Sequence, residues 1–129
     1  MGGGPQRRGA TWAQACAFAL KLPGVEQGTS YGTPSLHVRK KLLARLKEDG
    51  ETVAIRVDFA ERDVLIEMDP AVFYVTDHYR GYPAMLVRLK QVRFAMLERL
   101  IEQAWRMQAP RSLVQKTAGS PTRGKRVKR

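Results

Sequence analysis

The residues best suited to chemistry lie together in the segment 76–82. This stretch reads Thr-Asp-His-Tyr-Arg-Gly-Tyr and contains a carboxylate, one of the two histidines, an arginine and two phenols. Gly81 and the following Pro83 disfavour a regular element, which predicts a shaped loop between two strands. Because binding groups concentrate on loops held by a rigid scaffold, this loop is the first candidate for a site.

Asp77 and His78 invite a catalytic interpretation, but their spacing argues against it. Neighbouring side chains on an extended backbone point apart, so Asp77 is poorly placed to orient His78 as a triad carboxylate does. Thr29, Ser30 and Ser35 could act as nucleophiles only if the fold brings them close, and no nucleophile motif surrounds them. The alternative is a polar loop whose aspartate accepts backbone N–H groups. We therefore assign no catalytic residue.

A second polar segment, 28–34, could form a pocket with the first. It reads Gly-Thr-Ser-Tyr-Gly-Thr-Pro, and a strand rather than a helix is expected after it, which argues against a phosphate-binding loop. We expect the two segments to meet and to bury at least one tyrosine. The candidate pocket residues are Thr29, Tyr31, Thr76, Asp77, His78, Tyr79 and Tyr82. The tyrosines, with Trp105, would form a pocket or a base-stacking platform, or else the edge of the core.

No metal or other cofactor is expected. Asp77, His78 and Glu26 do not show a recognised ligand spacing. The single Cys16 cannot form an internal disulfide, and with two histidines it cannot complete a zinc site. An unpaired cysteine favours a reducing, cytoplasmic compartment. The sequence also lacks the roughly 20 apolar residues of a membrane span.

The net charge of +11 is concentrated at the ends of the chain. Residues 9–110 hold fourteen basic and twelve acidic residues, a balance of only +2. The segment 111–129 holds seven basic residues and few apolar ones, which predicts disorder. We expect a flexible segment 1–10, a domain 11–113 and a disordered basic tail 114–129. The tail is either an electrostatic arm or a solubilising end.

Hydrophobic periodicity predicts an α+β domain with the order α-β-β-β-α-β-β-α. Thr11 and Gln14 form a capping box at the first helix, Asp58 and Glu61 open the second, and Asp49-Gly50 marks a two-residue hairpin turn. The segment 26–34 is expected to be a polar loop. The expected elements are helix 11–21, strands 36–39, 42–47 and 52–57, helix 58–69, strands 73–75 and 85–90, and helix 94–106.

Tight turns require antiparallel pairing, so helices are expected to cover one face of a single sheet. Strand alternation then directs Leu42, Ala44 and Leu46 toward the helices. The opposite face carries no mid-strand acid and the following basic or titratable residues: His37, Arg39, Arg45, Lys47, Arg56, Arg88 and Lys90. Such a face is either a binding surface or a solvated face that discourages edge aggregation.

Four segments resemble the MmcQ/YjbR family of small bacterial proteins. They are 25–34, 41–46, 76–83 and the Ala-Trp-Arg sequence at 104–106, and the resemblance covers about 11–113. The resemblance implies a YjbR-like fold similar to secretion chaperones, with an antiparallel sheet and flanking helices. It also implies DNA binding, a label that rests on the shape of the family's β-hairpins, and it supplies no agreed catalytic residues.

The leading expectation is non-enzymatic DNA binding through the phosphate backbone, with little sequence preference. The residues expected to contact phosphates are Arg39, Lys40, Lys41, Arg45, Lys47 and Arg80, with the tail as an auxiliary arm. The alternative is a small-molecule or protein-binding module that uses the loops around Tyr31 and His78. An enzyme is the least favoured of the three.

Overall fold

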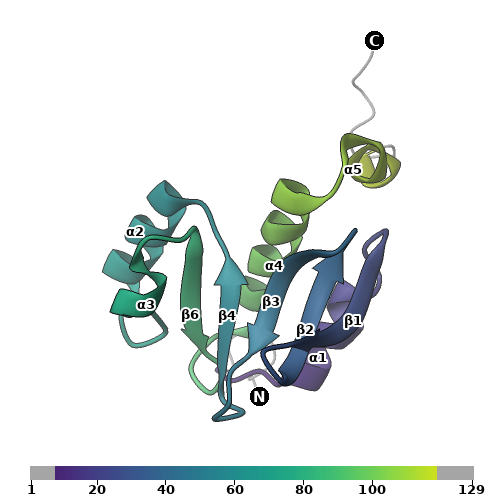
Figure 1. Cartoon of the computed structure of the whole chain (residues 1–129). Coiled ribbons are helices and arrows are strands. Elements are labelled where there is room, and N and C mark those ends of the chain that lie inside the picture. The colour runs from purple at the N-terminus through teal and green to yellow at the C-terminus, as the bar shows by residue number, and fades with distance from the viewer. Residues whose placement is uncertain (1–7, 119–129) are drawn as a thin grey trace, which may run out of the picture.

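The chain folds around a six-stranded antiparallel sheet, seen in a computed structural model that describes residues 8–118. The elements are α1 (Trp12–Ala19), β1 (Val25–Ser30), β2 (Thr33–Val38), β3 (Lys41–Leu46), β4 (Thr52–Arg56), α2 (Phe59–Met68), β5 (Phe73–Tyr74), α3 (Asp77–Arg80), β6 (Ala84–Arg88), α4 (Phe94–Gln108) and α5 (Arg111–Ala118). The strand order is β1-β2-β3-β4-β6-β5. Helices α1 and α4 lie behind the sheet, and α2 and α3 lie beside β6 (Figure 1). The expected α+β class with one antiparallel sheet is confirmed.

The expected helix starts are present. The backbone N–H of Gln14 donates to Thr11 Oγ1 at 3.0 Å, and the Gln14 amide oxygen accepts from the Thr11 N–H at 3.0 Å. Asp58 accepts from the Glu61 N–H at 3.3 Å and opens α2. These side chains satisfy N–H groups that have no partner within the helix. Both helices therefore begin where the sequence indicates.

The core lies between the sheet and α4. Register places Leu36 beside Ala44, Ala44 beside Ile55, and Ile55 beside Met85, and all four side chains are buried. Trp105 on α4 is fully buried, and its Nε1 donates to the Pro23 carbonyl at 2.9 Å. Trp105 is therefore a core residue and does not line a pocket.

Strand β3 departs from the expected alternation. The pairing of β2 with β3 shifts register between Leu36 and His37, as at a β-bulge. Leu43 is buried in the core cluster, whereas Leu42 is only half-buried. The expectation that Leu42 faces the core is therefore wrong, because the bulge resets the alternation along β3.

The segment expected to be a polar loop at 26–34 instead forms β1, a tight turn and the start of β2. Strand β1 is an edge strand, and its residues from Glu26 to Thr29 are exposed. An edge strand with little burial shows no apolar alternation, which is why the sequence pattern does not reveal it. Tyr31 and Gly32 make the turn, with φ of 54° and 81°.

Two further segments differ from expectation. The loop 76–82 contains one helical turn, α3, and residues 114–118 lie in α5 rather than in a disordered tail. Leu113 is buried and anchors α5. Residues 119–129 of the expected tail, and residues 1–7 of the expected flexible segment, lie outside the described residues.

The described end of the N-terminal segment pairs with the domain. Gly9 N–H donates to the Val92 carbonyl at 2.7 Å, and Ala10 N–H donates to the Leu89 carbonyl at 2.8 Å. Residues 9 and 10 of the segment expected to be flexible are therefore hydrogen-bonded to the domain. No helix within residues 8–118 is long and apolar enough to cross a membrane.

Candidate functional site

A cleft of about 710 Å³ lies along β3 and β4, and most of its lining residues are outside the core cluster. Arg45 and Ala54 are directly paired across β3 and β4, and both line it. Their neighbours Ala44 and Ile55 belong to the core cluster. Because successive strand residues point to opposite faces, Arg45 and Ala54 define the second face of the sheet. The volume of the cleft lies within the range of small-molecule sites.

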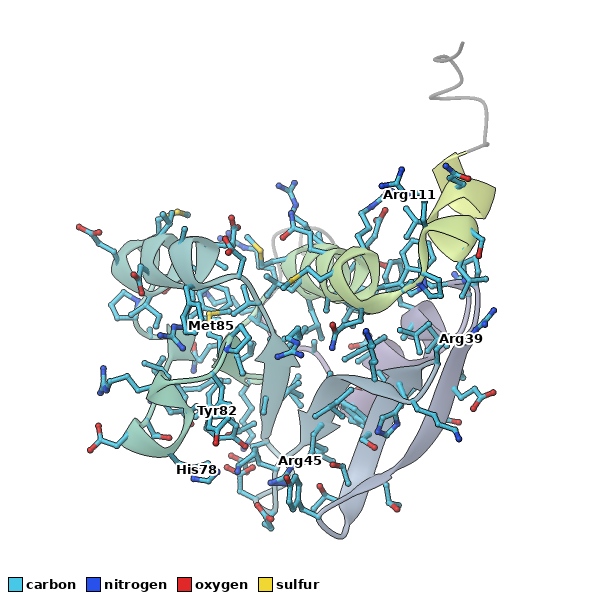
Figure 2. The ribbon with its side chains drawn as sticks, turned by 45° about the horizontal axis from the view of Figure 1, so that its top comes forward. Arg39, Arg45, His78, Tyr82, Met85 and Arg111 are labelled. Atoms are coloured by element: carbon cyan, nitrogen blue, oxygen red, sulfur yellow. The ribbon has the colours of Figure 1, made fainter. Side chains whose placement is uncertain are left out.

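The two polar segments singled out from the sequence line this one cleft. Tyr31 comes from the β1–β2 turn, and His78, Tyr79 and Tyr82 come from α3 and the residues after it. Figure 2 shows Arg45 on the sheet and His78 and Tyr82 on the α3 side of the same end of the molecule. The expected meeting of the two segments is therefore seen as two walls of a cleft.

The expected burial of a tyrosine is not met. Tyr31 and Tyr82 are 85% and 60% exposed, and Tyr79 is only half-buried. The remaining pocket candidates do not line the cleft: these are Thr29, Thr76 and Asp77. Thr29 lies on the exposed edge strand, and Asp77 points to solvent with its side chain 98% exposed. The tyrosines therefore form an open rim rather than a closed pocket.

Arg45 is buried within the cleft wall, with 5% exposure. Its Nη1 donates to Thr33 Oγ1 at 3.0 Å, and both Nη atoms lie 3.5 Å from Glu48 Oε2. The Tyr31 ring covers the guanidinium, with 5.1 Å from Cζ to the ring centroid. Strand alternation predicted the face of Arg45 correctly, but not that Tyr31 covers it. Arg45 is therefore not a free contact for a DNA backbone.

Two other expected phosphate contacts also have partners. Lys47 Nζ donates to the Tyr79 hydroxyl at 3.2 Å and lies 5.1 Å from its ring centroid. Arg80 Nη2 forms an ion pair with Asp77 at 3.0 Å. The expected phosphate contacts Arg45, Lys47 and Arg80 therefore all have partners within the domain.

Arg62 positions the α3 side of the cleft, and the sequence pattern did not single it out. It is 6% exposed on α2. Its guanidinium donates to the carbonyls of Tyr82 at 2.8 Å, Ala84 at 3.1 Å and Arg80 at 3.1 Å. One sequence signal could have found it: Arg62 lies three residues before Leu65, and this helical spacing puts both on the buried side of α2. Arg62 thus satisfies backbone carbonyls that the break around Gly81 leaves without helical partners.

Asp49 holds the turn between β3 and β4 at the edge of the cleft. Its carboxylate accepts the N–H of Glu51 at 2.8 Å, the Thr52 hydroxyl at 2.8 Å and the Thr52 N–H at 2.9 Å. These bonds, led by the one from Glu51, hold the pKa of Asp49 below its usual value. The Asp49-Gly50 hairpin is confirmed, although residues 47–51 form a longer connection than the expected two-residue turn.

A second candidate surface is the turn between β2 and β3, made by Arg39 and Lys40. Their φ angles are 49° and 72°. Two-residue hairpin turns with two positive φ angles favour Asn-Gly, because other residues are strained there. Arg39, Lys40 and the following Lys41 are all exposed, and none has an ion-pair partner within residues 8–118. We call these three residues the basic turn.

Helix α5 lies beside the basic turn. A Cβ built on Gly24, whose φ is +80°, would lie 2.6 Å from Leu113 Cδ1 and 3.9 Å from Arg39 Nε. Gly24 therefore allows α5 and Arg39 to approach the same point. Figure 2 shows Arg39 and Arg111 at this end of the molecule. Arg111 at the start of α5 therefore lies at the same end of the domain as the basic turn.

The described residues offer no metal centre. Within residues 8–118, no three His, Cys, Asp or Glu side chains are grouped to hold an ion. Asp77 and His78 lie on α3, whereas Glu26 lies on the edge strand β1. Cys16 is buried against the core, and this burial raises the pKa of its thiol.

The chain belongs to the YjbR family, whose model matches residues 20–107. Uncharacterised proteins of Mycobacterium tuberculosis (Rv2570) and Mycobacterium bovis (Mb2600) are each 48% identical over 67 residues, which are 51% of this chain and 52% of each relative. The chain thus spans about half the length of the curated relatives it matches. The crystal structure of Deinococcus radiodurans protein DR2400, domain DUF419, is similar in fold, with a TM-score of 0.66 and 14% identity. That match covers 89% of this chain and 83% of the other.

Proposed function

We propose that this protein binds nucleic acid through phosphate contacts made by the basic turn and by the basic residues of the C-terminal segment 111–129. The observation that carries the proposal is the backbone of Arg39 and Lys40, which both have positive φ in a two-residue turn. Residues in this conformation cost about 1–2 kcal/mol each relative to the ordinary regions. A turn that keeps two exposed cations at this cost, where Asn-Gly would be favoured, is best explained by a function of those cations.

The charge distribution supports the same surface. The three residues of the basic turn have no carboxylate partner among the described residues, whereas Arg45, Lys47 and Arg80 each have one or more contacts within the domain. The C-terminal segment adds Arg111 and Lys116, followed in the sequence by Arg123, Lys125, Arg126, Lys128 and Arg129. Lysine and arginine at a hairpin tip contact phosphates, which carry no base identity. Binding is therefore expected to show little sequence preference.

The proposal includes a cytoplasmic location, where bacterial nucleic acid is found, and it assigns no catalytic step. A reducing compartment is consistent with the single buried cysteine. DNA is the proposed partner.

A matched pair of variants tests the basic turn. Arg39→Gln with Lys40→Gln removes two charges there, and Lys90→Gln with Arg99→Gln removes two charges elsewhere. Lys90 follows β6 beside Glu51, and the exposed Arg99 lies on α4. In fluorescence anisotropy with two duplexes of unrelated sequence, we expect the first variant to weaken binding to both and the second to change it much less. Equal losses in the two variants would reduce the proposal to a net-charge effect.

A second candidate function is small-molecule binding in the cleft, the alternative predicted from the loops around Tyr31 and His78. The observation that favours it is the pair of exposed aromatic side chains, Tyr31 and Tyr82, in a cleft whose lining also contains Ala54 and Ala84. Large exposed aromatic side chains around a concavity are typical of binding surfaces. The basic turn and the cleft use different residues apart from Lys41, so variants separate the two functions.

A further inference from the structure

We propose that the cleft binds a small planar aromatic anion, whose ring contacts Tyr31 and Tyr82 and whose carboxylate or phosphate is bound by Arg45. This inference rests on the second candidate function and names its ligand class. It does not depend on nucleic-acid binding by the basic turn.

The first argument is the backbone of Tyr31. Its φ of 54° places it in the left-handed region, at a position of the two-residue turn where Asn is favoured. A bulky residue costs about 1–2 kcal/mol there. Its ring covers the buried Arg45 guanidinium, with 5.1 Å from Cζ to the ring centroid. Such contacts contribute about 0.5–1 kcal/mol at exposed sites and about 2 kcal/mol when the cation is desolvated. The ring itself is 85% exposed, so Tyr31 keeps this conformation without burying its ring, and a large aromatic surface is left for a ligand ring to contact.

The second argument is the incomplete pairing of Arg45. Charge-assisted N–H···O bonds are usually about 2.7–2.9 Å long, whereas Glu48 lies 3.5 Å from Arg45 and 3.8 Å from Lys47. The Glu48 side chain is 64% exposed, while that of Arg45 is only 7% exposed. A buried guanidinium therefore has a distant, solvated counterion. A carboxylate or phosphate in the cleft could displace Glu48 and bind the planar fork directly.

The charge of the whole lining favours an anion. Lys41, Arg45 and Arg56 line the cleft, and Glu48 is the acid among its lining residues. Low-dielectric walls strengthen the field of such a group of cations. A neutral or cationic ligand would gain little from this arrangement.

The third argument concerns shape. The lining includes Ala54 and Ala84, whose short side chains leave room for a flat ring in the cleft. The α3 side is held in place, because Arg62 binds the Tyr82 carbonyl at 2.8 Å and Lys47 binds the Tyr79 hydroxyl at 3.2 Å. Such preorganisation lowers the entropy lost on binding. Aromatic rings offset against one another gain about 0.5–1.5 kcal/mol beyond burial.

Four probes test the ligand class by titration calorimetry with the full chain. Adenosine 5′-monophosphate and 4-hydroxybenzoate each combine a planar ring with an anion, whereas adenosine lacks the anion and inorganic phosphate lacks the ring. We expect at least one ring-containing anion to bind about tenfold more tightly than adenosine and phosphate, as a charged hydrogen bond implies. Tighter binding of the nucleotide assigns a phosphate, and tighter binding of the benzoate assigns a carboxylate.

Variants locate the binding. The single variant Tyr31→Asn should fold at least as well as the natural protein, since Asn suits the turn. The double variant Tyr31→Asn with Tyr82→Ala should bind the better probe about tenfold more weakly. Arg39→Gln with Lys40→Gln should leave that affinity unchanged, which separates this test from that of DNA binding. The inference is overturned if no ring-containing anion binds more tightly than both adenosine and phosphate. It is also overturned if Tyr31→Asn with Tyr82→Ala leaves the affinity intact.

Discussion

Replacing the basic turn by Asn-Gly is predicted to stabilise the protein while weakening its binding to DNA. The change is Arg39→Asn with Lys40→Gly. Both residues are exposed and have positive φ, and no ion pair within the described chain is lost on substitution. The variant therefore removes strain and charge without disturbing the core.

The size of the effect follows from the backbone. Two left-handed L-residues cost about 1–2 kcal/mol each, and Asn and Gly relieve most of this strain. Glycine at position 40 destabilises the fold by about 0.5–1 kcal/mol, because it gives the unfolded chain more conformational freedom. The net gain is about 1–2 kcal/mol. For a domain of this size, each kcal/mol raises Tm by about 4 °C or more, so an increase of roughly 5–10 °C is expected.

Urea unfolding followed by tryptophan fluorescence measures this gain, because Trp105 is fully buried in the core. The midpoint should rise with an unchanged m-value, since the exposed surface of the two states stays the same. Arg39→Gln with Lys40→Gln is the matched control, because it removes the same charges but keeps the strained turn. If the Asn-Gly variant is no more stable than this control, the turn is not strained and the argument for its function is lost.

Three other perturbations follow from the contacts of single residues. Arg62→Met should destabilise the fold by about 3 kcal/mol in urea unfolding, because three part-buried carbonyls lose their charged donor. A loss below about 1 kcal/mol would show that Arg62 does not hold α3. Asp49→Asn should lower the free energy of unfolding at pH 7 but much less at pH 3. The pKa of the Asp49 carboxyl is lower in the folded protein than its ordinary value of 3.8, so the carboxylate stabilises the fold above pH 3.8, and this stabilisation is lost as the pH falls through the folded pKa. An equal loss at both pH values would contradict that linkage. Cys16 should react with a maleimide at pH 8 far more slowly in the folded protein than in urea, because burial shields the thiol and raises its pKa; equal rates would show that the α1 packing opens readily.

Local signals in the sequence predicted the framework of the domain well. The Thr11–Gln14 capping box, the Asp49-Gly50 hairpin and the apolar stripe of α4 are set by neighbouring residues, and each lies where it was predicted. Strand β1 was not predicted, because an exposed edge strand needs no apolar alternation. Its pairing with β2 forms only in the folded sheet and leaves no pattern within the strand itself. Helix α5 escaped because its stability comes from burial of Leu113 rather than from composition.

The candidate site was predictable in part. Tyr31, His78, Tyr79 and Tyr82 do line one cleft. Strand alternation identifies the face on which a cation lies but not what covers it, so Arg45 was expected to be open to solvent. The Arg62 contacts join α2 to the carbonyls before and within β6, and residues so far apart in sequence give no joint local signal.

The salt dependence of duplex DNA binding tests the central claim most directly. A chain truncated after Ala118 keeps every described element and removes five basic residues of the C-terminal segment. Its affinity should fall linearly with salt on logarithmic axes, with a slope of about −0.9 for each phosphate contacted. Changing Arg39, Lys40 and Lys41 to Gln should flatten that slope by about 2–3, whereas Lys90→Gln with Arg99→Gln should leave it nearly unchanged. Two results would contradict the proposed function: no binding of DNA by the truncated chain at low salt, or a salt slope that stays the same when Arg39, Lys40 and Lys41 are changed to Gln.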